Sequence, residues 1–354
     1  MERVMMKGNE ALAEGAIRAG CRYFFGYPIT PQNEIPEYMA RRMPEVGGVF
    51  LQAESEVSAI NMVYGAGGAG GRVMTSSSGP GISLKQEGIS YIAGAQVPCV
   101  IVNVARGGPG LGGLTPSQAD YFQATKGGGH GDYHLLVFAP GNTQEMVDLM
   151  GLAFDKAEEY RNPVMILTDA IMGQMMEPVV LPPMRTVSTD KPWATTGKHG
   201  RQKPNLINSL GLANEDLERI NRELQEKYTR MAAAEVRYEA DGTEDAGLVV
   251  VAYGTSSRVV RSAISRLREE GKKVGLFRPV TLWPFPQAPL ASLAAAGKRF
   301  LVVEMSAGQL VEDVTLAVND RAKVSFFGKL NGTVPTVREV YDRIQSLLTE
   351  GGER

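Results

Sequence analysis

Three polar side chains of different chemistry each follow a strand-like segment of the sequence. Thr30 comes after "RYFFGY", Glu56 comes after "VFLQA", and Arg106 ends the segment "CVIVNVAR". Because ligands of open α/β folds bind beyond the carboxyl ends of parallel strands, we expect a hydroxyl, a carboxylate and a guanidinium to converge on one crevice.

A structural interpretation stays open for each of these residues. Thr30 precedes Pro31, so it could cap the helix predicted from "PQNEIPEYMARR". Glu54 and Glu56 are predicted in the first turn of a helix, where the helix dipole alone favours carboxylates. Arg106 could pair with a structural acid, although the glycines after it would allow a ligand to approach the backbone. None of the residues is specific when taken alone.

The glycines of residues 63–81, "VYGAGGAGGRVMTSSSGPG", include the spacing G-x-G-x-x-G of a dinucleotide-binding turn. That turn requires a strand before it and a helix after it. Here Val57, Ile60 and Val63 precede the glycines at helical spacing, and the strand-like "RVMTSSS" follows them. We therefore predict a connection from a helix to a strand, and no NAD site.

Composition restricts the class of protein. The chain has 354 residues, a net charge of -2 and 43% hydrophobic residues, which gives no general attraction to nucleic acid or to anionic membranes. Its two cysteines, Cys21 and Cys99, are isolated and cannot ligate a zinc ion or an iron–sulfur cluster. The spacing of His130, Asp132 and His134 is more typical of a mobile glycine-rich loop than of a metal site. We expect a cytoplasmic protein with no metal site of its own, and no nucleic acid or membrane partner.

Apolar segments alternate with amphipathic ones through most of the chain, which predicts an α/β fold with doubly wound parallel sheets. The predicted strands of the first domain, residues 1–180, are 22–27, 49–53, 72–78, 99–106, 134–140 and 163–170. Residues 181–245 are predicted as a connector that contains one charged helix, "NEDLERINRELQEKYTRM". The alternation resumes in a smaller second domain, residues 246–354.

The motifs "FFGYPITP", "QAESEVSAINMVYGAGGAGGRVMTSSSGPG" and "VNVARGGPGLGG" together carry a resemblance. The chain resembles the α subunit of the 2-oxoacid:ferredoxin oxidoreductases, thiamine diphosphate enzymes of anaerobic metabolism, and within them the branch that acts on 2-oxoisovalerate. The resemblance covers nearly the whole chain. It implies two doubly wound domains of thiamine diphosphate enzyme type, a pyrimidine-binding type domain followed by a transketolase C-terminal type domain.

The resemblance also implies roles for single residues. Glu56 matches the family's glutamate that contacts the ring nitrogen of the cofactor's aminopyrimidine, where proton sharing activates the cofactor. Glu54 falls outside the matched position. Thr30 and Arg106 match positions that hold the carboxylate and carbonyl oxygen of the substrate. The segment "SSSGPG" is expected to line the pyrimidine pocket, and its cofactor-binding residues are Ser78, Gly79 and Pro80.

Family features that the chain lacks imply partner subunits. No "GDG" motif for Mg²⁺ and the diphosphate is present. The resemblance implies a β subunit with the Mg²⁺–diphosphate site and an iron–sulfur cluster, a ferredoxin-like δ subunit with further clusters, and a γ subunit. The complex would convert a 2-oxo acid and coenzyme A to acyl-CoA, CO₂ and reduced ferredoxin. The acid stays open between 2-oxoisovalerate, 2-oxoglutarate and pyruvate. A subunit of a 2-oxoacid dehydrogenase or transketolase-like enzyme, and a non-catalytic assembly subunit, are the alternatives.

Overall fold

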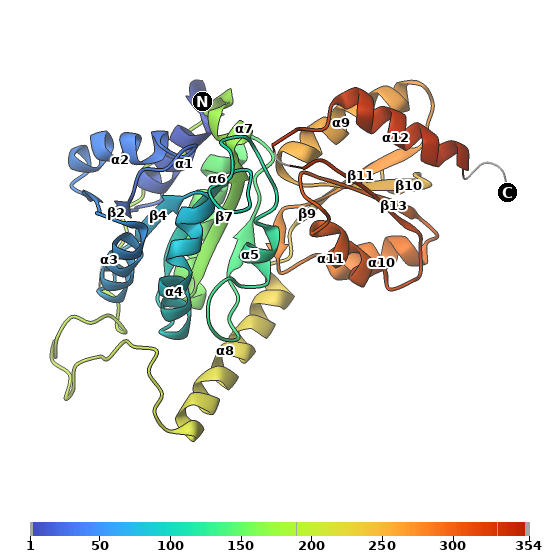
Figure 1. The fold of residues 1–354 in the computed structure, drawn as a ribbon. Coiled ribbons are helices and arrows are strands. Elements are labelled where there is room, and N and C mark those ends of the chain that lie inside the picture. The colour runs from blue at the N-terminus through green and yellow to red at the C-terminus, as the bar shows by residue number, and fades with distance from the viewer. Residues whose placement is uncertain (1–2, 189, 331, 351–354) are drawn as a thin grey trace.

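The structure, a computed structural model, describes residues 3–188, 190–330 and 332–350. Helices cover two sheets that form the main bodies of the molecule (Figure 1). Helix α8 (Asn214–Ala234), yellow in Figure 1, leads from a long loop to the junction between these bodies. None of the helices in these ranges is long and apolar enough to cross a membrane.

The first sheet has seven strands in the order β12-β6-β7-β5-β4-β2-β3. Its strands are β2 (Tyr23–Gly26), β3 (Val49–Gln52), β4 (Val73–Ser77), β5 (Cys99–Ala105), β6 (Leu136–Phe138), β7 (Pro163–Asp169) and β12 (Thr281–Trp283). All neighbours are parallel except β12, which pairs antiparallel with β6 at one edge. Each strand predicted within 22–170 is present, shortened at one or both ends.

Helices cover both faces of this sheet. They are α1 (Gly8–Arg18), α2 (Glu34–Glu45), α3 (Glu56–Gly68), α4 (Gly79–Gly94), α5 (Tyr121–Thr125), α6 (Thr143–Tyr160) and α7 (Ala170–Gln174). The chain moves one way along the sheet from β2 to β3 and the other way from β3 through β4 to β5. Since parallel crossovers are right-handed, α3 and α4 lie together on the face opposite α2. The packing agrees, because α3 contacts α4, and α1 contacts both α2 and α6.

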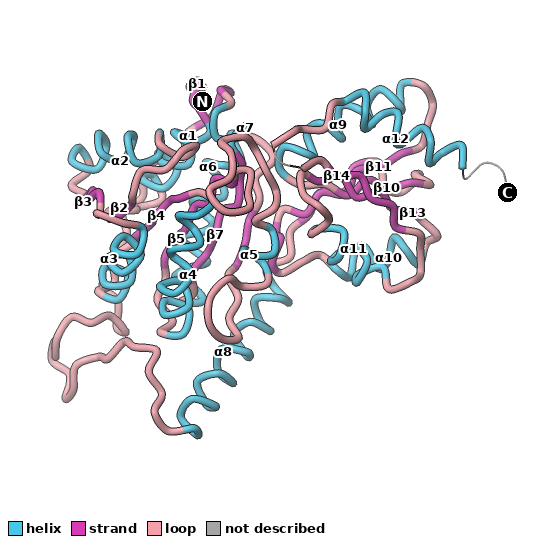
Figure 2. The backbone as a smooth tube through the Cα atoms, in the orientation of Figure 1, coloured by secondary structure: helices cyan, strands magenta, loops and turns pink. Residues whose placement is uncertain are grey.

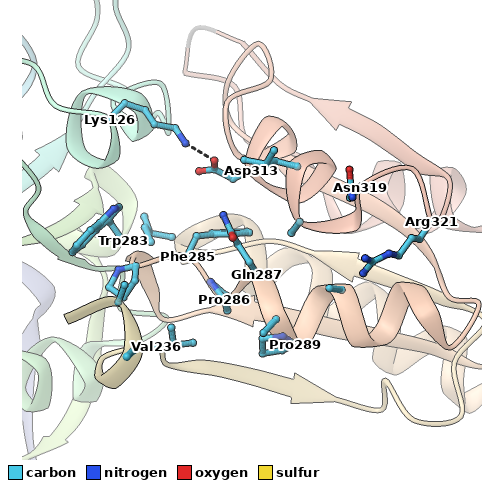
Figure 3. Close-up of a pocket in the computed structure, with 18 residues that line it drawn as sticks. Lys126, Val236, Trp283, Phe285, Pro286, Gln287, Pro289, Asp313, Asn319 and Arg321 are labelled. Atoms are coloured by element: carbon cyan, nitrogen blue, oxygen red, sulfur yellow. Dashed lines mark hydrogen bonds and ion pairs between the residues drawn. The ribbon is translucent and has the colours of Figure 1, made fainter. Parts of the chain in front are cut away.

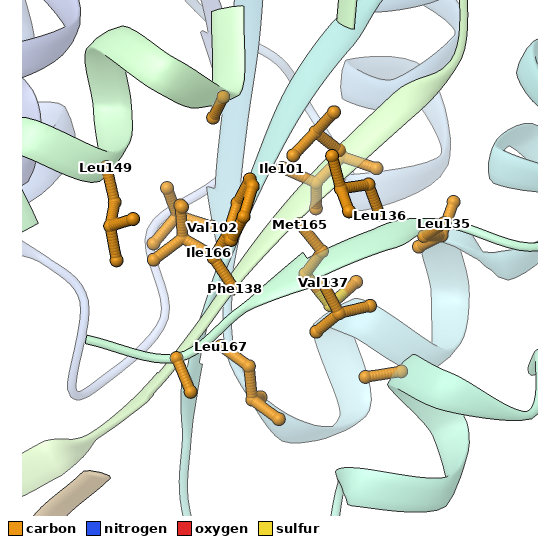
Figure 4. Close-up of a cluster of buried hydrophobic side chains, with 14 of the residues drawn as sticks. Ile101, Val102, Leu135, Leu136, Val137, Phe138, Leu149, Met165, Ile166 and Leu167 are labelled. Atoms are coloured by element: carbon orange, nitrogen blue, oxygen red, sulfur yellow. The ribbon is translucent and has the colours of Figure 1, made fainter. Parts of the chain in front are cut away.

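The centre of the sheet is apolar on both faces. Figure 4 shows side chains of β5, β6 and β7 packed together, among them Val102, Phe138 and Met165, each completely buried. A parallel strand covered on both faces needs a continuous run of apolar residues. This is why "CVIVNVA" and "PVMILTD" could be read as central strands from the sequence.

The glycine run connects a helix to a strand, as predicted. Helix α3 ends at Gly68 and strand β4 begins at Val73. Gly70 adopts a φ of 95° in the turn between them, a conformation that favours glycine. The order of elements is thus the reverse of a dinucleotide-binding turn.

A small two-stranded sheet was not predicted. Strand β1 (Arg3–Lys7) pairs antiparallel with β8 (Met176–Val180). The pairing could not be seen because it joins segments that lie far apart in the chain, and neither segment alternates cleanly. From β8 to α8 the described residues form the long loop drawn in Figure 2.

The second sheet has the order β14-β13-β10-β11-β9, with the antiparallel strand β9 at its edge. Its strands are β9 (Tyr238–Asp241), β10 (Leu248–Val251), β11 (Val274–Pro279), β13 (Arg299–Glu304) and β14 (Val324–Gly328). Its helices are α9 (Gly254–Glu269), α10 (Gln287–Ala295), α11 (Leu310–Val318) and α12 (Val337–Glu350). The segment "KVGLFRPVTLWPFP", predicted as part of the second domain, divides between β11 here and β12 in the first sheet. The predicted domain boundaries stay predictions.

Candidate active site

The candidate residues gather where the first sheet reverses its strand order. From β2 the chain crosses to β3 on one side, and β4 lies on the other side of β2. The loops that leave β2 and β4 therefore diverge and open a crevice beyond the strand ends. Thr30 lies in the loop after β2, and Ser78 directly follows β4.

Arg106 and Thr30 meet in this crevice. Arg106 follows β5 and is 5% exposed. Its Nη1 donates to the Thr30 carbonyl at 2.7 Å and its Nη2 donates to the Leu111 carbonyl at 2.9 Å. Among the described residues its Nε has no hydrogen-bond partner. The guanidinium is thus fixed by two backbone carbonyls and keeps donor capacity for a ligand.

The capping interpretation of Thr30 is wrong. Helix α2 begins at Glu34, with Asn33 as its N-cap residue. Asn33 Nδ2 instead donates to the Thr30 hydroxyl at 3.4 Å. The hydroxyl therefore lies outside the helix, in the loop that Arg106 holds.

Glu56 is the first residue of α3. Ser55 is the N-cap residue, and its hydroxyl accepts from the Ser58 amide at 3.2 Å. Glu56 is 6% exposed, whereas Glu54 lies before the helix and is exposed. The expectation that both carboxylates lie in the first turn is wrong for Glu54, because Ser55 caps the helix and its first residue is Glu56.

The first turn of α4 separates Arg106 from Glu56. At Gly79, which has a φ of 45°, a Cβ atom would lie 3.2 Å from Arg106 Nε. At Gly81 a Cβ atom would lie 2.6 Å from Glu56 Oε1 and 2.2 Å from Ser77 Oγ. The segment Gly79-Pro80-Gly81 thus brings backbone against the guanidinium and the carboxylate, which larger residues would prevent. Gly81 was not predicted as a site residue, because its role depends on this contact.

A cavity of about 440 Å³ lies beside this turn. Arg106, Gly79 and Pro80 line it, and the second body contributes residues such as Met305 and Gln309. Thr30, Glu56 and Ser78 are not among the described residues that line it. Three of the predicted residues, Arg106, Gly79 and Pro80, thus line the cavity. The other three lie in the loop after β2 (Thr30), at the start of α3 (Glu56) and directly after β4 (Ser78).

Asp120 is a lining residue that the sequence did not suggest. Burial raises the pKa of its carboxyl, while a hydrogen bond from Asn103 Nδ2 at 2.9 Å and the charge of Arg106 lower it. Asp120 lies in a long loop without a strand pattern, so only the fold brings it to Arg106.

The residues around Glu56 fit the aminopyrimidine half of thiamine diphosphate. Within the described ranges, the buried hydroxyls of Ser77 and Ser78 and the ammonium of Lys85 have no hydrogen-bond partner. Together with the carboxylate of Glu56, they offer polar contacts that a nitrogen heterocycle could satisfy. No group of three His, Cys, Asp or Glu side chains in the same ranges could hold a metal ion.

A larger cavity, of about 1010 Å³, lies elsewhere and contains none of the predicted residues. Figure 3 shows Trp283, Phe285 and the ion pair between Lys126 and Asp313 at its wall. The histidines of the glycine-rich loop are not gathered for catalysis either, since His130 is exposed and the ring of His134 stacks on Trp283 at 4.5 Å. The chemistry-bearing residues point to the smaller cavity.

Comparisons with known proteins agree with this assignment. Residues 14–240 match the family described as pyruvate flavodoxin/ferredoxin oxidoreductase, thiamine diphosphate-binding. Residues 246–340 match pyruvate:ferredoxin oxidoreductase core domain II. The chain belongs to the 2-oxoacid:ferredoxin oxidoreductases. The resemblance seen in the sequence is confirmed, and so is the predicted thiamine diphosphate enzyme fold.

Several 2-oxoacid:ferredoxin oxidoreductases show how close the relation is. The chain is 51% identical over 354 residues, the full length of both chains, to the ketoisovalerate oxidoreductase subunit VorB of Methanothermobacter thermautotrophicus. It is 38% identical to the 2-oxoglutarate synthase subunit KorA of Methanocaldococcus jannaschii, covering 96% of this chain and 98% of the relative.

Solved structures agree with the family and the fold. The 2-oxoglutarate:ferredoxin oxidoreductase from Magnetococcus marinus, with 2-oxoglutarate, coenzyme A and succinyl-CoA bound, has a TM-score of 0.83 and 28% identity. That match covers 97% of this chain and 65% of the Magnetococcus marinus chain. A split gene transketolase, an inactive β4 tetramer, has a TM-score of 0.60 at 14% identity, with 97% and 98% coverage, and supports the fold alone.

Proposed function

We propose that this chain is the α subunit of a cytoplasmic complex that oxidatively decarboxylates 2-oxoisovalerate, with coenzyme A as acyl acceptor and ferredoxin as electron acceptor. The geometry that carries this proposal is the first turn of α4, with Glu56 on one side and Arg106 on the other. A proton-sharing carboxylate for the cofactor and a guanidinium for the substrate carboxylate are what this reaction requires.

Each residue has a separate task in this proposal. When bound, thiamine diphosphate supplies the nucleophile that attacks the keto carbon of the 2-oxo acid. Glu56 shares a proton with the ring nitrogen of the aminopyrimidine, and Gly81 lets the carboxylate approach the helix. Arg106 and the Thr30 hydroxyl bind the substrate's carboxylate and carbonyl oxygen. Ser78, Gly79 and Pro80 line the pyrimidine pocket.

The composition of the cavity supports a substrate with one carboxylate. Arg106 is the single cationic residue among the described residues that line it, and Asp120 is the single acidic one. A second substrate carboxylate, as in 2-oxoglutarate, would find no second cation among these lining residues. The higher identity to the ketoisovalerate relative than to the 2-oxoglutarate relative points the same way.

Other subunits must supply the rest of the chemistry. Burial raises the pKa of the Cys21 thiol to about 12 and also raises that of Cys99, so neither is suited to be a thiolate ligand. We infer that a β subunit holds Mg²⁺, the diphosphate and an iron–sulfur cluster, and that a ferredoxin-like δ subunit and a γ subunit complete the complex.

The test is substrate-dependent reduction of methyl viologen by the complex that copurifies with a tagged form of this chain. The assay compares 2-oxoisovalerate, 2-oxoglutarate and pyruvate, with coenzyme A and thiamine diphosphate present. We expect the highest kcat/KM with 2-oxoisovalerate. A preference for 2-oxoglutarate would contradict the proposed substrate, and an assembled complex inactive with every acid would favour a non-catalytic role.

A further inference from the structure

Lys85 is a buried cation that the proposed chemistry has not used. It lies on α4, its side chain is completely buried, and within the described residues its Nζ has no hydrogen-bond partner. Lysine is almost never fully buried unless its charge is paired, because removing an ammonium from water is costly. The position therefore calls for a nearby opposite charge or a polar ligand.

The packing of α4 identifies the opposite charge. Helix α4 packs mainly against α3, β5 and β7, and α3 lies directly beside it (Figure 1). The charged residues of these three elements are Glu56 at the start of α3 and Asp169 at the end of β7. Asp169 is already engaged, since it accepts from the Thr255 hydroxyl at 2.9 Å. Glu56 is the charged group that acts on Lys85.

Helix geometry places Lys85 on the same face as the contact with Glu56. Gly81 and Lys85 are four residues apart on α4, so they are neighbours along one face. The Glu56 carboxylate lies against Gly81. Burial lowers the pKa of Lys85 to about 8, and the negative charge of Glu56 opposes that shift. The two groups are not hydrogen-bonded to each other.

Packing alone does not explain a lysine at this position. Two neighbours of Lys85 on the buried stripe of α4, Ile82 before it and Ile89 after it, are apolar and completely buried. An apolar residue such as Met would fill the same place without desolvating a charge. Electrostatic action on a neighbouring group accounts for the ammonium, whereas filling space does not.

We propose that Lys85 is the buried counter-charge of Glu56, a positioning residue that stabilises the carboxylate beneath the first turn of α4. This inference rests on the proposed function, because it assumes that Glu56 acts on thiamine diphosphate. Burial alone favours the neutral acid, and a nearby ammonium favours the carboxylate. Lys85 therefore sets where the proton shared between Glu56 and the ring nitrogen resides, and so the pH range in which the site works.

The experiment compares Lys85→Met and Lys85→Arg with the wild type in the assembled complex. Lys227→Met is the matched control, because Lys227 is also a buried lysine, 3% exposed, but lies on α8 and donates to the Arg161 carbonyl at 3.2 Å. Two quantities are measured between about pH 5.5 and about pH 9. The first is kcat/KM for 2-oxoisovalerate. The second is the affinity of the cofactor-stripped complex for thiamine diphosphate, determined by calorimetry.

We expect Lys85→Met to move the acid limb of the kcat/KM profile upward by about one pH unit or more, since an adjacent charge shifts a carboxyl by that order. Thiamine diphosphate affinity should fall by about tenfold more at pH 6 than at pH 8. Lys85→Arg keeps the charge, so its kcat/KM profile and its thiamine diphosphate affinity should stay close to those of the wild type. Lys227→Met should match the wild type in both. If Met prevents assembly, Lys85→Gln provides the same comparison.

Unchanged acid limbs and affinities in a folded Lys85→Met or Lys85→Gln complex would overturn the inference. The variant Glu56→Gln separates this outcome from a failure of the proposed function. Loss of activity in Glu56→Gln together with a wild-type profile in the Lys85 variants would remove only the counter-charge role. Full activity in Glu56→Gln would remove the proposed role of Glu56, and the inference with it.

Discussion

Replacement of Gly81 by alanine tests the position of the Glu56 carboxylate directly. The added Cβ would lie 2.6 Å from Glu56 Oε1, whereas an ordinary contact begins at 3.4 Å. The carboxylate would have to retreat by about 0.8 Å, and a misplacement of that order costs roughly 100-fold in rate. Ser77 Oγ, 2.2 Å from the same Cβ, would have to rotate away as well.

The fold should tolerate this substitution. Both clashing atoms end flexible side chains, and alanine within a helix is favoured over glycine by about 0.5–1 kcal/mol. We therefore expect kcat for methyl viologen reduction with 2-oxoisovalerate to fall about 100-fold in a complex that assembles and unfolds like the wild type. Circular dichroism and size-exclusion chromatography would establish that the complex is intact.

Gly65→Ala is the matched control for Gly81→Ala. Gly65 lies in α3, is exposed, and a Cβ added there meets no atom within 4 Å. This variant should keep wild-type kcat and gain slightly in stability, since alanine restricts the unfolded chain. A Gly81→Ala complex with kcat within about threefold of the wild type would refute the placement of Glu56 at the reaction centre.

Three further predictions follow from the same geometry. Arg106→Lys should lower kcat/KM about 100-fold, because an ammonium cannot bind the Thr30 carbonyl and also present a planar fork to the substrate. Steady-state kinetics measures this change, and a decrease of less than about threefold would contradict the prediction. Burial lowers the pKa of Lys85 to about 8 in the folded chain, from an ordinary value of 10.5. The free-energy cost of burying its charged ammonium is therefore fully present below pH 8 and is lost as pH rises through 10.5. The stability of the wild-type chain relative to Lys85→Met should therefore rise by roughly 2–3 kcal/mol between pH 7 and pH 10 in denaturant unfolding, and an unchanged difference would argue against a buried, titrating lysine. Ser55→Ala should cost about 1 kcal/mol in the same measurement, because it removes the cap of the helix that carries Glu56; no loss of stability would show that the cap contributes nothing.

Periodicity was sufficient to predict the central strands. The strands β5 and β7 are uninterrupted apolar runs because helices cover both of their faces, so each run shows directly in the sequence. The helix-to-strand order around the glycine run was also visible, since Ile60 and Val63 keep a helical spacing up to the turn. These are local signals, and local signals need no knowledge of the fold.

Features that depend on distant pairing were not predictable. Thr281 of β12 lies 143 positions after Phe138 of β6, and the two residues are partners in the antiparallel pairing of these strands. Nothing in its short sequence identifies that partner. Strands β1 and β8 were missed for the same reason.

The candidate site was predicted only in part. Glu56, Thr30 and Arg106 could be proposed from the sequence because each follows a strand or matches a family motif, and their roles stay predictions. Gly81 depends on an approach between two helices that no spacing encodes. Lys85 did leave a signal, since it interrupts the apolar stripe of "GISLKQEGIS" at a position that a helix would bury.

The most direct test of the central claim is the activity of Glu56→Gln in the assembled complex. Glutamine keeps the size of the side chain but cannot share a proton as a carboxyl group does. Glu54→Gln is the matched control, because Glu54 is exposed and lies just before the same helix. The account predicts a loss of at least about tenfold in methyl viologen reduction for Glu56→Gln, with normal assembly and no loss for Glu54→Gln. Wild-type activity in Glu56→Gln would contradict it.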